Sequence, residues 1–172
     1  MPSKLFDLSG RVAVVMGGTS GIGRTLAGRL AEAGANVVAT GRRENLVPKV
    51  ADDIEKLGRK TASLTSYVSF FEVAAYAVSK SRLLGLTHSF AIEWAQKGVN
   101  VNAIAPGVFR TELNSGLLDG TGGGRELLMR TPMKRFGKVS ELVGAAIVLA
   151  SDAAASLRAS VFRLMAGSLR QG

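Results

Sequence analysis

A strand, a glycine-rich turn and a helix follow one another near the start of the chain, in RVAVVMGGTSGIGRTLAGRL. Residues 12–16 form a short, continuous apolar run, which is typical of a parallel strand covered on both faces. Glycines follow, and then apolar residues recur every four positions, as on one face of a helix. A second short strand is predicted at residues 37–40. The economical interpretation is a βαβ unit with a right-handed crossover, which places the chain in the α/β class.

The glycine-rich turn predicts a site for a dinucleotide. Residues without a Cβ atom let backbone N–H groups approach a pyrophosphate, and the N-terminus of the following helix adds a partial positive charge. Glycines alone also occur in structural turns, but the full context of strand, turn, helix and strand favours nucleotide binding. We expect the contacts to come from six residues of the turn: Gly17, Thr19, Ser20, Gly21, Ile22 and Gly23.

Two arginines after the second strand bear on which dinucleotide binds. An NAD site usually carries an acidic residue about 20 residues beyond the glycines, where it contacts the ribose. That region reads Gly41-Arg42-Arg43 here. Guanidinium groups can grip a 2′-phosphate bidentately, so the sequence predicts NADP(H), with NAD(H) as the alternative. In the simpler interpretation, Arg42 and Arg43 are solvated loop charges.

Composition narrows what else the chain can be. A length of 172 residues with 47% apolar residues predicts one folded domain over residues 1–172. The absence of cysteine and the single histidine, His88, exclude a disulfide framework and a thiolate or histidine-rich metal site. The formal charge is +9, but the basic residues are scattered and no nucleic-acid motif accompanies them. We therefore predict a cytoplasmic protein with neither a nucleic-acid nor a membrane partner.

The remaining elements are predicted from apolar periodicity and turn residues. They are helices at residues 44–57 and 73–97, a strand in VNVNAIAPG, a mobile glycine loop at residues 120–124 before a short helix, a helix capped by Ser140, and a last strand in SVFRLM. The long helix is expected to end at Gly98.

A serine, a tyrosine and a lysine form the candidate catalytic group. Tyr76 and Lys80 are four residues apart on a predicted helix, so they share a face. A phenol titrates near about 10, and a neighbouring ammonium group lowers that pKa. Tyr76 could then exchange a proton with a substrate oxygen while a hydride moves, and Ser63 could hydrogen-bond the same oxygen. Taken alone, a tyrosine and a lysine at this spacing are common on helix surfaces.

The glycine turn, Ser63, Tyr76, Lys80 and the stretch NAIAPG, in this order, resemble the short-chain dehydrogenase/reductase family. The resemblance implies a Rossmann-like, doubly wound parallel sheet and a nicotinamide-dependent enzyme that interconverts an alcohol and a carbonyl. It implies that Ser63, Tyr76 and Lys80 are catalytic, and that Tyr76 and Lys80 also contact the cofactor, Lys80 at the nicotinamide ribose. The residues matching the segment that borders the nicotinamide are Pro106, Gly107, Val108 and Thr111.

The resemblance extends to a subgroup. PGVFRTELNSGLLDG and the residues after it are similar to gluconate 5-dehydrogenase-like members. This similarity implies a small alcohol or carbonyl substrate such as a sugar acid or a polyol.

The resemblance also has one large gap. Members of the family continue after RKTA through several strands and helices, whereas Ala62 joins directly to Ser63 here. The missing span is on the order of 60 residues and holds central strands of the sheet. It also holds a helix that the family uses for subunit pairing, so a homo-oligomer is compatible with the chain but weakened.

Two hypotheses describe the consequence of this gap. In the first, residues 59–65 pair with residues 12–16 as a substitute strand, which keeps Ser63 near Tyr76. In the second, the shortened sheet exposes an apolar edge. The chain is then a catalytically impaired nucleotide-binding remnant or a truncated gene product.

Overall fold

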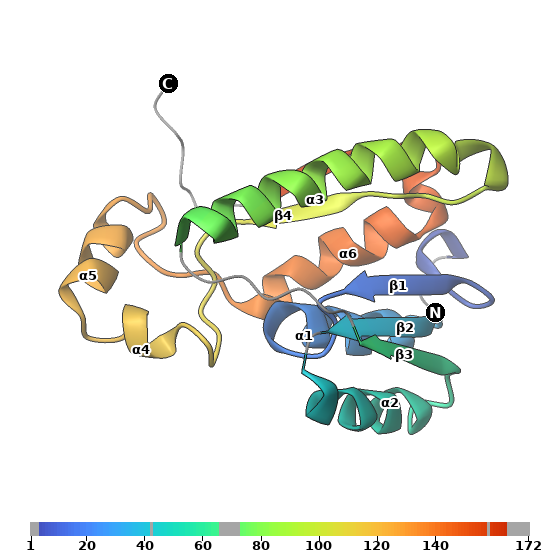
Figure 1. The fold of residues 1–172 in the computed structure, drawn as a ribbon, viewed down its shortest axis with the longest axis horizontal. Helices are drawn as coiled ribbons and strands as arrows, with labels where there is room; N and C mark the ends of the chain where they lie inside the picture. Colours follow the sequence, from blue (N-terminus) through green and yellow to red (C-terminus); the bar gives the residue numbers. More distant parts are fainter. Residues whose placement is uncertain (1–3, 42, 66–72, 158, 165–172) are drawn as a thin grey trace.

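The computed structural model describes residues 4–41, 43–65, 73–157 and 159–164, drawn as a ribbon in Figure 1. Its strands are β1 (Val12–Met16), β2 (Asn36–Gly41), β3 (Thr61–Thr65), β4 (Ala103–Pro106) and β5 (Val161–Leu164). Its α-helices are α1 (Gly21–Glu32), α2 (Val47–Glu55), α3 (Val73–Glu93), α4 (Ser115–Leu118), α5 (Gly122–Met129) and α6 (Val143–Ala150). Short 3₁₀ helices are η1 (Lys4–Phe6), η2 (Glu44–Leu46), η3 (Ala95–Lys97), η4 (Val139–Leu142) and η5 (Asp152–Ala154).

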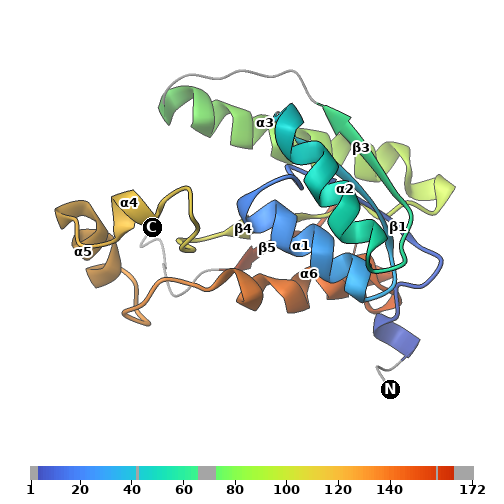
Figure 2. The ribbon, with the colours of Figure 1, turned by 90° about the horizontal axis from the view of Figure 1, so that it is seen from below.

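Within these residues the strands form two parallel sheets, one with the order β1-β2-β3 and the other made of β4 and β5. Helix α1 contacts both α2 and α6. The second sheet lies between α3 and α6 in Figure 2. The predicted α/β fold, a Rossmann-like parallel sheet that is short of its central strands, is confirmed.

The core lies between the first sheet and helices α1 and α2. Its nine buried apolar residues are Leu8, Ala27, Leu30, Ala31, Ala35, Val37, Ala39, Val50 and Ile54. Val50 and Ile54, four residues apart in the helix predicted at residues 44–57, are both almost fully buried. Leu57, the last residue of that predicted helix, is 42% exposed because α2 ends earlier, at Glu55.

Strand β1 is covered on one face. Ala13 and Val15 pack against the core. Val12, Val14 and Met16, which point to the opposite face because side chains alternate along a strand, are 63–65% exposed. The prediction that this strand is covered on both faces is therefore wrong.

The prediction that residues 59–65 pair with Val12–Met16 is also wrong. Strand β3 pairs in parallel with β2, from Val37 opposite Thr61 to Gly41 opposite Thr65. The start of β3 is fixed there by hydrogen bonds, since Val37 N donates to Lys60 O at 3.0 Å and Thr61 Oγ1 donates to Val37 O at 2.8 Å. Helix α2 packs beside α1, and the short connection after α2 leads the chain to the outer edge of β2.

The second half of the chain follows the prediction in part. Helix α3 ends at Glu93, and the 3₁₀ turn η3 follows. The helical segment then ends at Gly98, which has a φ of +71°, as predicted. The strand predicted in VNVNAIAPG is limited to β4.

Two local predictions in this half are wrong. Glycines 122–124 form the first turn of α5 rather than a loop, because Thr121 Oγ1 accepts a hydrogen bond from Gly124 N at 2.9 Å. Ser140 does not cap α6. It lies inside η4, where Glu141 Oε2 accepts from Lys138 N at 2.9 Å, and α6 begins at Val143.

Candidate functional site

The turn between β1 and α1 has a backbone that only glycine accommodates at its key positions. Gly17 and Gly21 have φ angles of +82° and +52°, in the left-handed region. A Cβ atom at Gly23 would lie 2.1 Å from Gly17 O, so the first turn of α1 approaches the preceding loop too closely for any side chain. The three glycines predicted to shape a phosphate site are thus each required by the geometry of the turn.

The N-terminus of α1 faces this turn without a neutralising carboxylate. Ser20 is the N-cap residue, its side chain makes no capping hydrogen bond, and the first turn carries no acidic residue. Arg24, in that first turn, forms an ion pair with Asp53 at 2.6 Å. The positive end of the helix dipole is therefore available to an anion.

The end of β2 is tied to the same turn. Thr40 Oγ1 accepts from Gly17 N at 3.4 Å, and a Cβ atom at Gly41 would lie 1.8 Å from Thr19 Oγ1. Thr19, one of the predicted turn residues, is 3% exposed. Its side chain therefore supports the loop from beneath. Thr40 was not singled out from the sequence, since a threonine near the end of a strand carries no distinctive signal.

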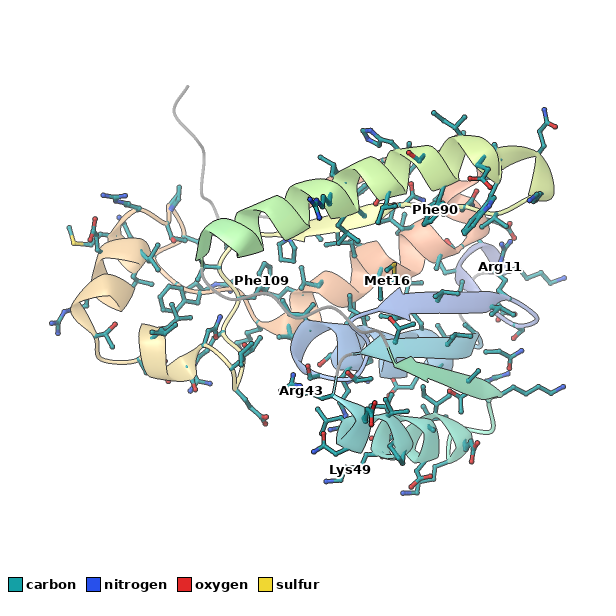
Figure 3. All side chains as sticks on the ribbon, viewed as in Figure 1. Arg11, Met16, Arg43, Lys49, Phe90 and Phe109 are labelled. Carbon is teal, nitrogen blue, oxygen red and sulfur yellow. The ribbon has the colours of Figure 1, made fainter. Side chains whose placement is uncertain are left out.

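Arg43 contacts the turn between β1 and α1. The guanidinium group of Arg43 donates to Ser20 Oγ, which places a cation at the N-cap of α1 (Figure 3). Arg43 is exposed and directly precedes the 3₁₀ turn η2. Arg42 lies outside the described residues. That Arg42 and Arg43 bind a 2′-phosphate stays a prediction.

The three predicted catalytic residues are divided between two elements. Ser63 is paired with Ala39, so β2 lies between it and β1. Tyr76 and Lys80 lie one turn apart near the start of α3, which confirms the predicted helix. Helix α3 begins toward the same end of the molecule as the arrowheads of β1, β2 and β3 in Figure 1. The side chains of all three residues lie outside the described part of the chain, so their catalytic roles stay predictions.

The segment predicted to border the nicotinamide is anchored at both of its sides. Pro106 is the last residue of β4, and Gly107 N donates to Leu164 O at 2.8 Å. Val108 O then accepts from Gly137 N at 3.0 Å. These main-chain bonds hold the backbone at the end of β4 between two distant parts of the sequence.

Asn114 fixes the rest of that segment, although the sequence did not single it out. Its Oδ1 accepts from Thr111 N at 2.7 Å and from Thr111 Oγ1 at 3.1 Å, and its Nδ2 donates to Phe109 O at 2.8 Å. Arg110 donates to Asp119 through two nitrogens, at 2.6 and 2.9 Å. These hydrogen bonds hold the pKa of the Asp119 carboxyl below its usual value.

No group of three or more potential metal ligands occurs in the described ranges, and none of the helices described there is long and apolar enough to cross a membrane.

Comparisons with known proteins place the chain in a family. The model described as short chain dehydrogenase matches residues 11–65, and the model described as Enoyl-(Acyl carrier protein) reductase matches residues 60–167. The chain belongs to the short-chain dehydrogenase/reductase family. The two matches overlap in β3, the strand in which the sequence predicted the gap.

Among curated relatives, the 2-dehydro-3-deoxy-D-gluconate 5-dehydrogenase of Bacillus subtilis (strain 168) is 42% identical over 92 residues, or 54% of this chain and 36% of the relative. The galactitol 2-dehydrogenase (L-tagatose-forming) of Cereibacter sphaeroides is 34% identical over 122 residues, or 71% of this chain and 47% of the relative. The chain thus spans less than half of either relative.

The fold is similar to that of solved structures. One, from Beutenbergia cavernae, is assigned as an NAD(P)-dependent gluconate 5-dehydrogenase and contains NADP at low occupancy. It superposes with a TM-score of 0.80 at 28% identity, over 95% of this chain and 98% of that chain.

Proposed function

We propose that the chain is an NADP(H)-dependent oxidoreductase that interconverts an alcohol and a carbonyl on a small molecule, a sugar acid or a polyol. The observation that carries the proposal is the position of Arg43, whose guanidinium group contacts Ser20 at the N-terminus of α1. A cation at this point suits the 2′-phosphate that distinguishes NADP from NAD.

The residues of the turn fit the dinucleotide. Gly17 and Gly21 adopt left-handed φ angles, Gly23 approaches Gly17 too closely for a side chain, and the first turn of α1 has no competing carboxylate. We infer that the turn holds the diphosphate and that Arg43 holds the 2′-phosphate. When bound, the nicotinamide supplies the acceptor or donor of a hydride.

The remaining chemistry is proton transfer by the protein. We expect Tyr76 to donate a proton to the substrate oxygen or accept one from it, with the Lys80 ammonium group stabilising the phenolate. Ser63 lies in a strand on the far side of β2 from β1. If that placement keeps the Ser63 hydroxyl from donating to the substrate oxygen, the rate falls by about 10²–10³, the typical cost of removing one such donor.

The relatives support the substrate class. The names of the Bacillus subtilis and Cereibacter sphaeroides proteins describe dehydrogenases of a sugar acid and of a polyol. Because the chain spans less than half of each, we propose this class for the chain rather than transfer a particular substrate.

Cofactor choice is tested by fluorescence titration. We expect NADPH to bind about tenfold or more tightly than NADH, because Arg43 pairs with the extra phosphate. Arg43→Ala should remove this preference. Lys49→Ala, an exposed cation on the neighbouring helix α2, should keep it and serves as the matched control. Equal affinity of the unmodified chain for the two cofactors would contradict the proposal.

Turnover is tested separately, by NADPH oxidation with a panel of keto-sugar acids and ketoses. We expect slow oxidation that Tyr76→Phe abolishes while NADPH still binds. A second candidate function, nucleotide binding without turnover, is favoured by the position of Ser63 in β3. Tight NADPH binding with no oxidation of any substrate would support this second function.

A further inference from the structure

The first turn of α1 carries an arginine of its own, close to the N-cap residue that Arg43 contacts. Ser20 O accepts a hydrogen bond from Arg24 N at 3.2 Å, so Arg24 lies one helical turn beyond Ser20 on the same side of α1. Side chains of a helix lean toward its N-terminus. The Arg24 side chain therefore leaves α1 close to Ser20, whose hydroxyl accepts from Arg43.

Arg24 is held by a carboxylate of the neighbouring helix. Its Nη2 atom lies 2.6 Å from Oδ2 of Asp53 in α2, and about half of each side chain is exposed. Helices α1 and α2 contact one another, and the chain enters α2 through Arg43 and the 3₁₀ turn η2. Arg43 and the ion pair thus both connect the start of α1 to the segment that contains α2.

An ion pair of this kind is easily exchanged for another anion. Exposed pairs contribute little free energy, because water solvates both groups well. A 2′-phosphate carries about two negative charges at pH 7 and can accept two parallel hydrogen bonds from one guanidinium group. It therefore attracts a cation more strongly than the single charge of a carboxylate does. The arginine side chain has several rotatable bonds, so it can turn from Asp53 to an anion near Ser20 while α1 stays in place.

Another ion pair of α1 differs from this one only in its place. Arg29 and Glu32 also lie 2.6 Å apart, and about half of each side chain is exposed. Both belong to the last part of α1, at the end remote from the glycine turn, whereas Arg24 belongs to the first turn and is paired with a different helix. Arg29 and Glu32 therefore provide a matched control pair.

We propose that Arg24 is a further cation for the 2′-phosphate of NADP(H), and that Asp53 competes with the phosphate for it. In the free chain Asp53 neutralises Arg24, while Arg43 already contacts the N-cap residue. When the 2′-phosphate reaches Arg43, Arg24 leaves Asp53 and binds the same phosphate. Arg24 is then a cofactor-binding residue, and Asp53 is a positioning residue that acts through it. This inference rests on the proposed function, because it needs the dinucleotide in the turn between β1 and α1.

Fluorescence titrations with NADPH and NADH, which differ in the 2′-phosphate, test the proposal. Arg24→Gln should weaken NADPH binding by about five- to tenfold, the loss of one charge-assisted contact, and NADH binding by about twofold or less. Asp53→Asn should tighten NADPH binding by about two- to fivefold, since an exposed pair competes only weakly, with a smaller effect on NADH. Arg29→Gln and Glu32→Gln should leave both affinities as they are.

The double variant Arg24→Gln/Asp53→Asn separates a positioning role of Asp53 from a direct one. If Asp53 acts through Arg24, Asp53→Asn has no effect on NADPH binding once the guanidinium group is gone, so the two substitutions are non-additive. Direct repulsion between Asp53 and the phosphate would persist in the double variant. Asp53→Glu keeps the charge and should restore the affinity of the unmodified chain. If Arg24→Gln does not fold, the NADPH-to-NADH ratios of Asp53→Asn and Asp53→Glu decide the question.

Three results would overturn the proposal. One is an NADPH affinity that Arg24→Gln leaves unchanged. Another is an equal change in NADPH and NADH binding, which a merely structural role would produce. The third is a gain from Asp53→Asn that persists in the double variant. The preference of the unmodified chain for NADPH, measured in the same titrations, reports separately on the proposed function. Its absence would overturn that function and this inference together.

Discussion

The two sheets differ in how completely they are packed, although they belong to one chain. The first sheet shares a core of nine buried apolar residues with α1 and α2. In the second, β4 has two half-buried and two exposed residues, and Ile92 of α3 is 78% exposed. The glycine turn therefore stands on a unit that carries its own core. In α3, the helix of Tyr76 and Lys80, the described side chains are mostly exposed or half-buried, and Thr87 and Ala91 are the buried ones among them. Cofactor binding should consequently be more robust than catalysis.

The largest effect expected from this comparison is on stability. Ile54 is 1% exposed and lies in the first core, so Ile54→Ala should lower the free energy of unfolding by about 2–5 kcal/mol. Ile92→Ala removes the same atoms from α3 and should change it by about 0.5 kcal/mol or less. Urea denaturation followed by circular dichroism measures both. Similar losses for the two variants would mean that α3 is packed as tightly as the first core.

The next effect separates two glycines of α1. A Cβ atom at Gly23 would lie 2.1 Å from Gly17 O, whereas a Cβ atom at Gly28 would point into open space. Gly23→Ala should distort the turn, abolish NADPH binding and destabilise the fold by about 1–3 kcal/mol, as overpacking does. Gly28→Ala should stabilise the helix by about 0.5–1 kcal/mol and leave binding intact. Thermal melts and NADPH titration distinguish the two. Retained binding in Gly23→Ala would remove the turn from the site.

The same contrast explains what the sequence could predict. The glycine turn and the helix that carries Val50 and Ile54 depend on local spacing, and local spacing was sufficient to predict them. The partner of β3 depends on where a crossover ends. TASLT has the composition of a strand but does not say which edge it joins.

Hydrogen bonds made by individual polar side chains were also beyond the sequence. Thr40 meets Gly17 from the end of another strand, and Asn114 makes three hydrogen bonds inside a loop. Threonine and asparagine are common in both settings, so neither residue type nor spacing marks these two positions. Only the folded geometry reveals that each one holds a segment of the candidate site.

A smaller effect is expected at the loop after β4. Asn114→Ala removes three hydrogen bonds and should destabilise the loop locally by about 1–3 kcal/mol. Asn114→Asp keeps the acceptor for Thr111 but loses the donor to Phe109, so its effect should be intermediate. Amide exchange at Thr111 measures the local opening, and global stability should hardly change. Equal exchange rates in all three proteins would show that the loop is held by other contacts.

The smallest effect is a pH dependence in the same region. Hydrogen bonds from Arg110 lower the pKa of Asp119 from its usual 3.8. Because the folded-state pKa lies below the unfolded one, the pair stabilises the fold above about pH 4 and this contribution is lost as the pH falls through the folded-state value. The group is exposed, so screening by solvent keeps the gain small. An NMR titration of the Asp119 carboxyl should show a midpoint below 3.8 that Arg110→Gln moves upward. A midpoint that does not respond to this substitution would mean that the ion pair does not persist in solution.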